Sequence, residues 1–452
     1  MNNQNDQIKS ASLWTWFKFL VPSLIGIFIF IFPINDASGE LTVPVAFIAN
    51  KIIAFFGDNI VNYITVSLMV LSALLTVFFT YIKKSNVRVV LELFDKGIGW
   101  VIVRVLGAIF GVMVLMNVGP EPVISENTGG TVLTGLIPTL FAAFLIAGFL
   151  LPLLLNYGLL EFVGTLLRRF MRPVFTLPGR STVDNLASWV GDGTIGVLLT
   201  SKQYEGGFYT KREAAVIASM FSVVSITFTI VILDYLHLMK YFAPFYITVI
   251  IAGLLCAIIL PRIPPLSKIE DTYYTEDNDF TEEIPDTHNT FSWATHQALV
   301  TAKRASGIDG VAKEGYKTVL DMWFGVLPVV MAIGTLGTIA AEYTPIFTWI
   351  GAPFVPLLEM LGIPDALLVS KTLFIGFTDM YLPTLIIGAE SADMSKFIVA
   401  ALSISQLLYL SEVGGVILGS KIPLGITKMF IIFLMRTAIS LPIILIAAYI
   451  IF

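Results

Sequence analysis

Two lone aspartates stand inside long apolar stretches of this chain, each among small and hydroxyl-bearing neighbours. Their segments are Val190-Gly191-Asp192-Gly193-Thr194 and Gly376-Phe377-Thr378-Asp379-Met380. A carboxylate at the centre of a bilayer costs about 2.5–3.5 kcal/mol, so an acid in such a place indicates a function. Small neighbours let the backbone approach a ligand closely. Asp192 and Asp379, with Thr194 and Thr378, therefore suit a polar solute or a coupling cation; the alternative is that each acid only caps the helix after it.

The apolar segment after each aspartate carries further polar side chains. The first has Ser222 and Ser225, whose spacing puts both hydroxyls on one face of a helix. The second has Gln406 and Glu412, which are costly to bury in hydrocarbon. We interpret these four residues as the second half of a solute-binding site. The alternative for the serines is a structural contact between helices.

The composition places these residues in a membrane protein. Of the 452 residues, 56% are hydrophobic and 13% are charged, and the mean hydropathy is +0.85. Such a chain is predicted to be an all-α polytopic membrane protein, because helices satisfy their own backbone hydrogen bonds in lipid. The net charge of −5, without basic clusters among aromatics, argues against nucleic-acid binding.

The residue types also argue against an enzyme. The one cysteine, Cys256, cannot form an internal disulfide, and the three histidines lack the spacing of metal ligands. The chain has no phosphate-binding loop, dinucleotide fingerprint or nucleophile elbow. We therefore expect no enzymatic activity, no metal and no cofactor apart from a coupling Na⁺ or H⁺.

Nine apolar runs have about the 17–25 residues needed to cross a membrane. They are Leu13–Ile34, Asn59–Ile82, Gly97–Val118, Thr131–Leu155, Glu213–Leu236, Phe242–Leu260, Lys317–Ala341, Ser395–Gly419 and Thr427–Phe452. The shorter run Leu41–Phe56 is predicted to be an amphipathic or interfacial helix. Residues 182–204 and 364–390, which contain Asp192 and Asp379, are apolar but interrupted by Gly or Pro. We predict two re-entrant hairpins there, since irregular backbone at membrane depth must face protein or a water-filled cavity.

Basic residues predict the orientation of these elements. Lysines and arginines gather in loops 83–96, 168–212 and 421–428, and all three are cytoplasmic if the N-terminus is cytoplasmic. The opposite loops, around Glu126 and Glu342, are poor in Lys and Arg. The span before the first hairpin then runs inward and the span before the second runs outward. The two hairpin units are thus predicted to be inverted repeats, offset by 379 − 192 = 187 residues.

This reading divides the chain into four parts. Residues 1–130 form N-terminal scaffold helices, and residues 131–260 form the first repeat. An acidic, polar stretch at 261–316 is a cytoplasmic linker, and residues 317–452 form the second repeat.

The first repeat resembles the nucleoside-recognition, or Gate, domain. The similarity lies in Val190-Gly191-Asp192-Gly193, Gly206-Gly207-Phe208, Arg212-Glu213-Ala214-Ala215 and Phe221-Ser222-Val223-Val224-Ser225. The segment Gly376-Phe377-Thr378-Asp379-Met380-Tyr381-Leu382-Pro383 resembles a second copy. The chain as a whole is similar to the YjiH-like membrane proteins and, more distantly, to concentrative nucleoside transporters. The resemblance spans roughly residues 131–452 and implies two inverted hairpin-plus-helix units around a midplane site.

We therefore expect a secondary active transporter of the cytoplasmic (inner) membrane, with a cytoplasmic N-terminus. Alternating access would move a small polar organic solute, nucleoside-like by resemblance, with coupling to Na⁺ or H⁺. Because Asp192, Asp379 and Glu412 would bring negative charge to the centre, a cationic or zwitterionic amino acid is the alternative solute. A further alternative is a non-transporting scaffold or signalling protein, which would not need acids in broken helices. The expected partners are the solute and membrane lipid, and a homo-oligomer is left open.

Overall fold

The protein is an all-α polytopic membrane protein. The computed structural model describes residues 12–30, 32, 34–35, 41–82, 93–94, 98–190, 193–224, 226–275, 284–285, 289–305 and 307–452. In these residues helices dominate, and the one sheet pairs β1 (Ile34–Asn35) with β2 (Leu41–Thr42) in antiparallel register.

The helices of the first half of the chain run from α2 to α13. They are α2 (Leu13–Phe30), α3 (Pro44–Phe56), α4 (Asp58–Val77), α6 (Ile98–Met116), α7 (Glu121–Ile124), α8 (Ile137–Leu155), α9 (Leu159–Phe175), α10 (Ser181–Val190), α11 (Gly193–Glu205), α12 (Lys211–Met220) and α13 (Ile226–Tyr235). Two π-helical segments, Phe78–Ile82 and Glu126–Leu136, extend α4 and precede α8.

The helices of the second half include both long and short elements. They are α14 (Phe242–Ile259), α15 (Thr290–Arg304), α16 (Ile308–Gly325), α17 (Leu327–Tyr343), α18 (Ile346–Gly351), α19 (Val355–Met360), α20 (Ala366–Ile375), α21 (Leu382–Ile387), α22 (Asp393–Gln406), α23 (Val413–Gly419) and α24 (Ile426–Ile451). Single 3-10 turns occupy Met239–Tyr241, Leu260–Arg262, Leu266–Lys268 and Ala352–Phe354.

Seven stretches of the described chain are long and apolar enough to cross a membrane. They are Leu13–Phe30, Asn59–Ile82, Ile98–Met116, Glu121–Leu155, Met239–Lys268, Asp309–Tyr343 and Ile426–Ile451. Each corresponds to one of the nine predicted spans. In two of the seven stretches a second helix begins at a proline. Pro138 lies in the first turn of α8 and Pro328 lies in the first turn of α17. A proline is tolerated there because its missing N–H costs no helical hydrogen bond.

The prediction of one continuous helix is wrong for the other two spans. Residues 213–236 form α12 and α13 with a non-helical break between them, and residues 395–419 form α22 and α23 with a second break. Apolar composition predicted the length of these segments correctly. It could not predict the interruptions, because neither break contains Gly or Pro.

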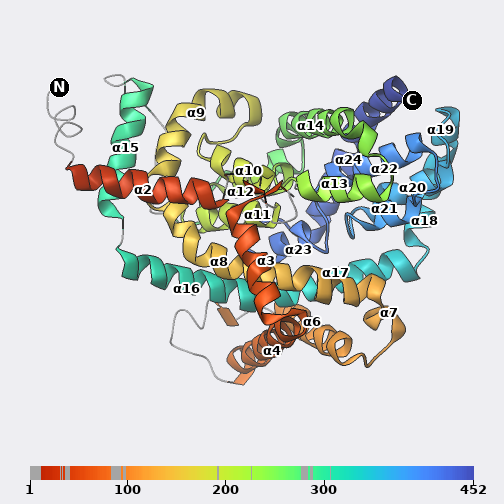
Figure 1. Ribbon diagram of the computed structural model, residues 1–452, viewed down its shortest axis with the longest axis horizontal. Helices are drawn as coiled ribbons and strands as arrows, with labels where there is room; N and C mark the ends of the chain where they lie inside the picture. The colour runs from red at the N-terminus through yellow and green to blue at the C-terminus, as the bar shows by residue number, and fades with distance from the viewer. Residues whose placement is uncertain are drawn as a thin grey trace.

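The buried side chains form two large cores, and both broken helices pass between them. The first core holds α11, α12 and α23 together with α8 and the α16–α17 region. The second core holds α13, α20, α21 and α22. Each core thus contains one helical pair, α10–α11 or α20–α21, and one half of each broken helix. In Figure 1, α8 and α16 lie on the left of the molecule and α18 to α22 lie on the right.

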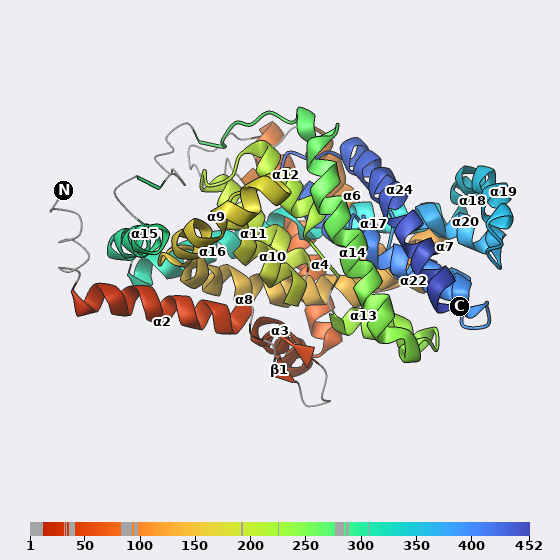
Figure 2. The same cartoon turned by 90° about the horizontal axis from the view of Figure 1, so that it is seen from above.

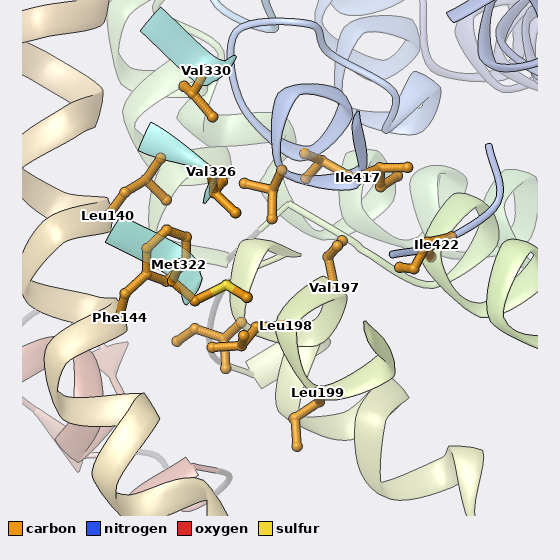
Figure 3. Close-up of a cluster of buried hydrophobic side chains, with 14 of the residues drawn as sticks. Leu140, Phe144, Val197, Leu198, Leu199, Met322, Val326, Val330, Ile417 and Ile422 are labelled. Atoms are coloured by element: carbon orange, nitrogen blue, oxygen red, sulfur yellow. The ribbon is translucent and has the colours of Figure 1, made fainter. Parts of the chain in front are cut away.

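The first core shows why α11 is held firmly. Figure 3 shows Val197 and Leu198 of α11 facing Phe144 of α8, Met322 of α16 and Ile417 of α23. All five side chains are at most 2% exposed. In lipid, apolar side chains such as these hold helices together by close van der Waals packing. The contact therefore fixes α11 against scaffold helices from both halves of the chain.

The polar linker contributes one helix to the bundle. Within the predicted linker, residues 290–304 form α15, and α16 begins at Ile308. Ala298 and Leu299 of α15 pack on Phe19 of α2, with Phe162 of α9 at the edge of the cluster. In Figures 1 and 2, α15 lies beside α9 and α2, at the end of the molecule opposite α18 and α19.

Candidate functional site

The first break separates α12 from α13 at the point where the chain leaves the first core. The helix ends at Met220, and Val223 N donates to Phe221 O at 2.8 Å in place of a helical bond. Gly193, the first residue of α11, packs against this break so closely that an added Cβ would lie 2.9 Å from Ser222 O. A glycine at the start of α11 is therefore needed for the approach of α11 to the break.

The second break separates α22 from α23 and is bound to the α20–α21 pair by its backbone. Leu407 turns the chain with a φ of +61°, a left-handed conformation that costs a non-glycine residue energy. Leu410 N then donates to Phe377 O at 2.8 Å, and Ser411 N donates to Thr378 O at 2.9 Å. Inside a continuous helix these two N–H groups would donate to helix carbonyls. Here the carbonyls of Phe377 and Thr378 accept from them instead, so the buried break leaves neither N–H group unsatisfied.

A cavity of about 90 Å³ lies where the two breaks and the two helical pairs meet. We call it the central cavity. Its wall combines Gly193 of α11, Met380 of the α20–α21 connection and Phe228 of α13 with residues from both breaks, namely Ser222, Val223, Val224, Tyr409, Glu412 and Val413. Each of these residues is buried or half-buried. The cavity thus sits at the seam between the two cores, with hydroxyl and carboxylate groups in a largely apolar wall.

Asp379 precedes the cavity residue Met380 in the chain but does not itself line the cavity, and its carboxylate makes three hydrogen bonds. Oδ1 accepts from Tyr381 N at 2.7 Å and Leu382 N at 3.0 Å, at the start of α21. Oδ2 accepts from the Ser411 hydroxyl at 2.8 Å. The acid therefore does cap the following helix, and it also joins that helix to the second break.

The structure brings some of the other predicted residues to the cavity and not others. Ser222 and Glu412 line it. Thr194 is buried in the first turn of α11, and the buried Thr378 hydroxyl donates to Ile375 O at 2.8 Å. Asp192 and Ser225 lie outside the described residues.

Gln406 does not line the central cavity. Its Nε2 donates to Leu373 O at 2.8 Å and to Thr437 Oγ1 at 2.9 Å, which joins α22 to α20 and α24. A polar side chain in a span can serve such a contact between helices as well as a ligand. The position of Gln406 therefore supports a contact between helices rather than a contact with a solute in the central cavity.

Arg436 is the central residue that the sequence reading missed. It lies on α24, is 1% exposed, and donates to the last carbonyls of two interrupted helices. Its Nε and Nη2 reach Ser405 O at 3.0 and 2.7 Å, and its Nη1 reaches Ser219 O at 3.2 Å. Such carbonyls lack an intrahelical partner and carry the negative end of the helix dipole, so a guanidinium suits them. An arginine in the middle of a predicted span was the available signal.

The helical pair α10–α11 is joined by its own buried hydrogen bonds. Asp184 of α10 is 1% exposed and accepts from Tyr209 Oη at 2.9 Å, Gln203 Nε2 at 3.0 Å and Thr200 Oγ1 at 3.3 Å. Its carboxylate is therefore a structural acceptor that joins α10 to α11 and to the turn before α12. Across the described residues, no group of three or more His, Cys, Asp or Glu side chains is arranged to hold a metal ion.

Comparison with known proteins agrees with this architecture. The family model for nucleoside recognition, the Gate domain, matches residues 133–239, which run from α8 through α10, α11 and the first broken helix. An uncharacterised protein of Alkalihalophilus pseudofirmus is 46% identical over 439 residues, covering 96% of this chain and 94% of its own length. No solved structure gives a significant match. The chain therefore belongs to one family with that relative, and it contains a Gate domain at residues 133–239.

Proposed function

We propose that this protein is a secondary active transporter that moves a small polar organic solute across the cytoplasmic membrane by alternating access. The observation that carries the proposal is the central cavity, which is bounded by the ends of α11, α13 and α23 and by both breaks. Paired interrupted helices that meet near mid-membrane are the usual setting of a transporter's solute site. The Gate domain in the first repeat supports the same reading.

The lining of the central cavity suits a nucleoside-like solute. At about 90 Å³ the cavity is smaller than the roughly 300–1,000 Å³ of most small-molecule sites, so we propose that it widens when the solute binds. Phe228 and Tyr409 supply aromatic surface, while Ser222 and Glu412 supply polar groups that bind hydroxyls or ring N–H groups. A solute with a flat apolar part and several hydroxyls would use both kinds of wall.

Alternating access is supported by the arrangement of the two cores. Each broken helix begins in one core and ends in the other, and the cavity lies on the seam between them. A small displacement of one core against the other would change the cavity's shape without unfolding either core, because packed interfaces move as units. We propose that this displacement exposes the cavity first to one side and then to the other, with Na⁺ or H⁺ as the coupling ion.

A cationic or zwitterionic amino acid is the second candidate solute. Glu412 lines the cavity, and Asp379 accepts from the hydroxyl of Ser411, the residue before Glu412, whereas no Lys or Arg is among the described residues that line the cavity. A net negative site favours a solute with an ammonium group, because a buried carboxylate binds a cation by a charge-assisted hydrogen bond.

Uptake by purified protein in liposomes tests the proposal and separates the two solutes. We expect labelled uridine to accumulate when a Na⁺ or proton gradient is applied, and not in protein-free liposomes. The result that overturns the proposal is folded protein that accumulates neither uridine nor arginine under either gradient and is not stabilised thermally by either solute.

Glu412→Gln distinguishes the solutes. A neutral nucleoside keeps an acceptor at the glutamine, so its uptake should fall less than about tenfold. A cationic solute loses a charge-assisted bond of about 1.5–3 kcal/mol, so its binding should weaken about ten- to a hundredfold. Glu359→Gln, at an exposed carboxylate of α19, is the matched control and should behave as the unaltered protein.

A further inference from the structure

Three charged side chains are buried where α9 packs against the start of α10. They are Glu161 of α9, Arg180 just before α10, and Asp184 of α10, and each is at most 4% exposed. Arg180 Nη2 lies 3.7 Å from Glu161 Oε1, and the same guanidinium faces Asp184. We call these three residues the α9–α10 charge cluster. In Figures 1 and 2, α9 lies beside α10.

The charges of this cluster do not balance if both acids are ionised. Two carboxylates and one guanidinium then have a net charge of −1, in a place that water does not reach. An uncompensated buried charge is so unfavourable that the group takes up a proton instead. The cluster is therefore expected to hold one proton.

The elements packed on α9 do not supply the missing positive charge. Helices α8 and α14 contain no Asp, Glu, Lys or Arg, and Lys303 and Arg304 of α15 are exposed. His296 of α15 stacks on Trp293.

The arginines of α9 itself lie elsewhere. Arg168 and Arg169 are about two turns further along the helix from Glu161. Arg172 Nη1 lies 2.6 Å from Glu213 Oε1 of α12, so that pair is balanced by itself. In the described part of the chain, Arg180 is thus the cation that the two buried acids share.

Asp184 has the partners of an ionised acid, and Glu161 does not. Asp184 Oδ1 accepts from Gln203 Nε2 at 3.0 Å, and Oδ2 accepts from Tyr209 Oη at 2.9 Å. Glu161 Oε2 is buried and accepts no hydrogen bond from any described residue. Its other oxygen is too far from Arg180 for a hydrogen bond. An ionised carboxylate needs donors on its oxygens, so the proton belongs on Glu161.

We propose that Glu161 is a proton-binding site, whose carboxyl is protonated at neutral pH and so neutralises the α9–α10 charge cluster. Loss of this proton in alkali leaves an unbalanced negative charge in the first core, between α9 and the α10–α11 pair. The packing of α9 on this pair then weakens as the pH rises.

The sign of the pH dependence follows from burial. Helix α9 is not one of the seven spans, and burial raises the pKa of the Glu161 carboxyl above its ordinary value although Arg180 opposes the rise. A pKa that is higher in the folded than in the unfolded state gives a stabilisation that is complete at acid pH. This stabilisation declines as the pH rises from the ordinary pKa of glutamate to the pKa in the folded protein.

Infrared spectroscopy tests whether the cluster holds a proton. A protonated carboxyl group has a C=O stretch that is distinct from the bands of a carboxylate. With the full-length protein near pH 7, in a detergent free of esters and carboxyl groups, we expect such a band that Glu161→Gln lacks. Glu359→Gln, at the exposed acid of α19, should retain it.

Thermal unfolding places the proton on Glu161. Glutamine replaces a neutral acid with a neutral amide, so Glu161→Gln should keep its unfolding midpoint near pH 7. Asp184→Asn removes an ionised acceptor of two hydrogen bonds, so its midpoint should be lower. Between about pH 5 and about pH 9 the midpoint of the unaltered protein should fall more steeply than that of Glu161→Gln. Glu359→Gln should follow the unaltered protein.

Three results would overturn the proposal. They are an infrared band that Glu161→Gln retains, a lower midpoint near pH 7 for Glu161→Gln than for Asp184→Asn, and parallel pH profiles for Glu161→Gln and the unaltered protein. Failure of Glu161→Gln to fold near pH 7 also contradicts it, because a protonated acid should tolerate its own amide. None of these measurements depends on transport or on the solute of the central cavity.

Discussion

At the scale of single residues, Asp379 combines two roles that the sequence presents as alternatives. Its carboxylate caps α21 through two backbone N–H groups, and it accepts from Ser411 in the second break. A cap explains why a carboxylate is tolerated at this depth, since the N-terminus of a helix is the favourable end for a negative charge. Both carboxylate oxygens already accept hydrogen bonds from the protein, and the neighbouring Met380, not Asp379, lines the central cavity.

Asp379→Asn separates capping from binding. Asparagine caps nearly as well as aspartate, so we expect the variant to fold with an unfolding midpoint close to that of the unaltered protein. If the charge binds a coupling cation or a cationic solute, affinity should fall about ten- to a hundredfold, as loss of about 1.5–3 kcal/mol implies. Uptake kinetics and thermal unfolding in detergent measure the two effects separately.

Asp309→Asn, at an exposed acid in the first turn of α16, is the control for loss of one negative charge. Unchanged uptake in Asp379→Asn would show that the carboxylate is a cap alone. Asp379→Ala should differ from both, because it removes the cap as well and should cost about 0.5–2 kcal/mol of stability.

At the scale of elements, the two broken helices depend on groups that lie far away in the sequence. The second break is stabilised by carbonyls of the α20–α21 pair, and the helix ends on both sides of the seam share the guanidinium of Arg436. Arg436 stands on α24 between residues of the first core, such as Phe433, and residues of the second, such as Ile444. The last span therefore joins the two broken helices through Arg436.

Arg436→Lys tests this tie between the broken helices. Lysine keeps the positive charge, but its single ammonium cannot reproduce the fork of a guanidinium that reaches two helix ends. We expect the loss of at least one charge-assisted hydrogen bond, about 1.5–3 kcal/mol, and a lower thermal unfolding midpoint. Arg169→Lys, at an exposed position on α9, should leave the midpoint unchanged. Equal midpoints for the two variants would mean that Arg436 does not stabilise the breaks.

At the scale of the whole molecule, contacts between loops agree with the predicted sides of the membrane. Lys211 Nζ lies 2.9 Å from Glu270 Oε2, which joins the start of α12 to the linker, and both were predicted to be cytoplasmic. The hydrogen bond from Lys211 lowers the pKa of the Glu270 carboxyl below its ordinary value. On the side predicted to be exterior, Asn127 Nδ2 lies 3.4 Å from Glu342 Oε1. Each contact pairs two loops of the same predicted side.

Cysteine labelling tests the orientation itself. In a Cys256→Ala background, Glu270→Cys should be shielded from an impermeant thiol reagent in intact cells, while Glu126→Cys and Glu342→Cys should react. All three glutamates are exposed in the structure, so accessibility within the fold does not limit the reaction. After the cells are opened, all three sites should react alike. Strong labelling of the Glu270 site in intact cells would reverse or reject the predicted topology, including the cytoplasmic N-terminus.

The sequence by itself determined the class of protein and the lengths of its apolar elements. Composition predicted an all-α membrane protein, and apolar runs predicted seven spans that the structure shows as long helices, because bilayer thickness acts on local sequence alone. The helical pairs α10–α11 and α20–α21 lie within the ranges predicted for hairpins, where glycine and proline interrupt the pattern. Asp379 and Glu412 were visible for the same reason, as acids in apolar surroundings.

Only the tertiary structure decided where the two remaining spans break and which groups meet at the centre. The breaks at Phe221–Val224 and Leu407–Glu412 contain neither Gly nor Pro, so no local signal opposes a continuous helix. Their unpaired backbone groups are satisfied by the carbonyls of Phe377 and Thr378 and by the guanidinium of Arg436. Such partners lie tens to hundreds of residues away in the chain. A broken helix becomes stable only when packing brings them into place, and the cavity between the breaks is a consequence of that packing.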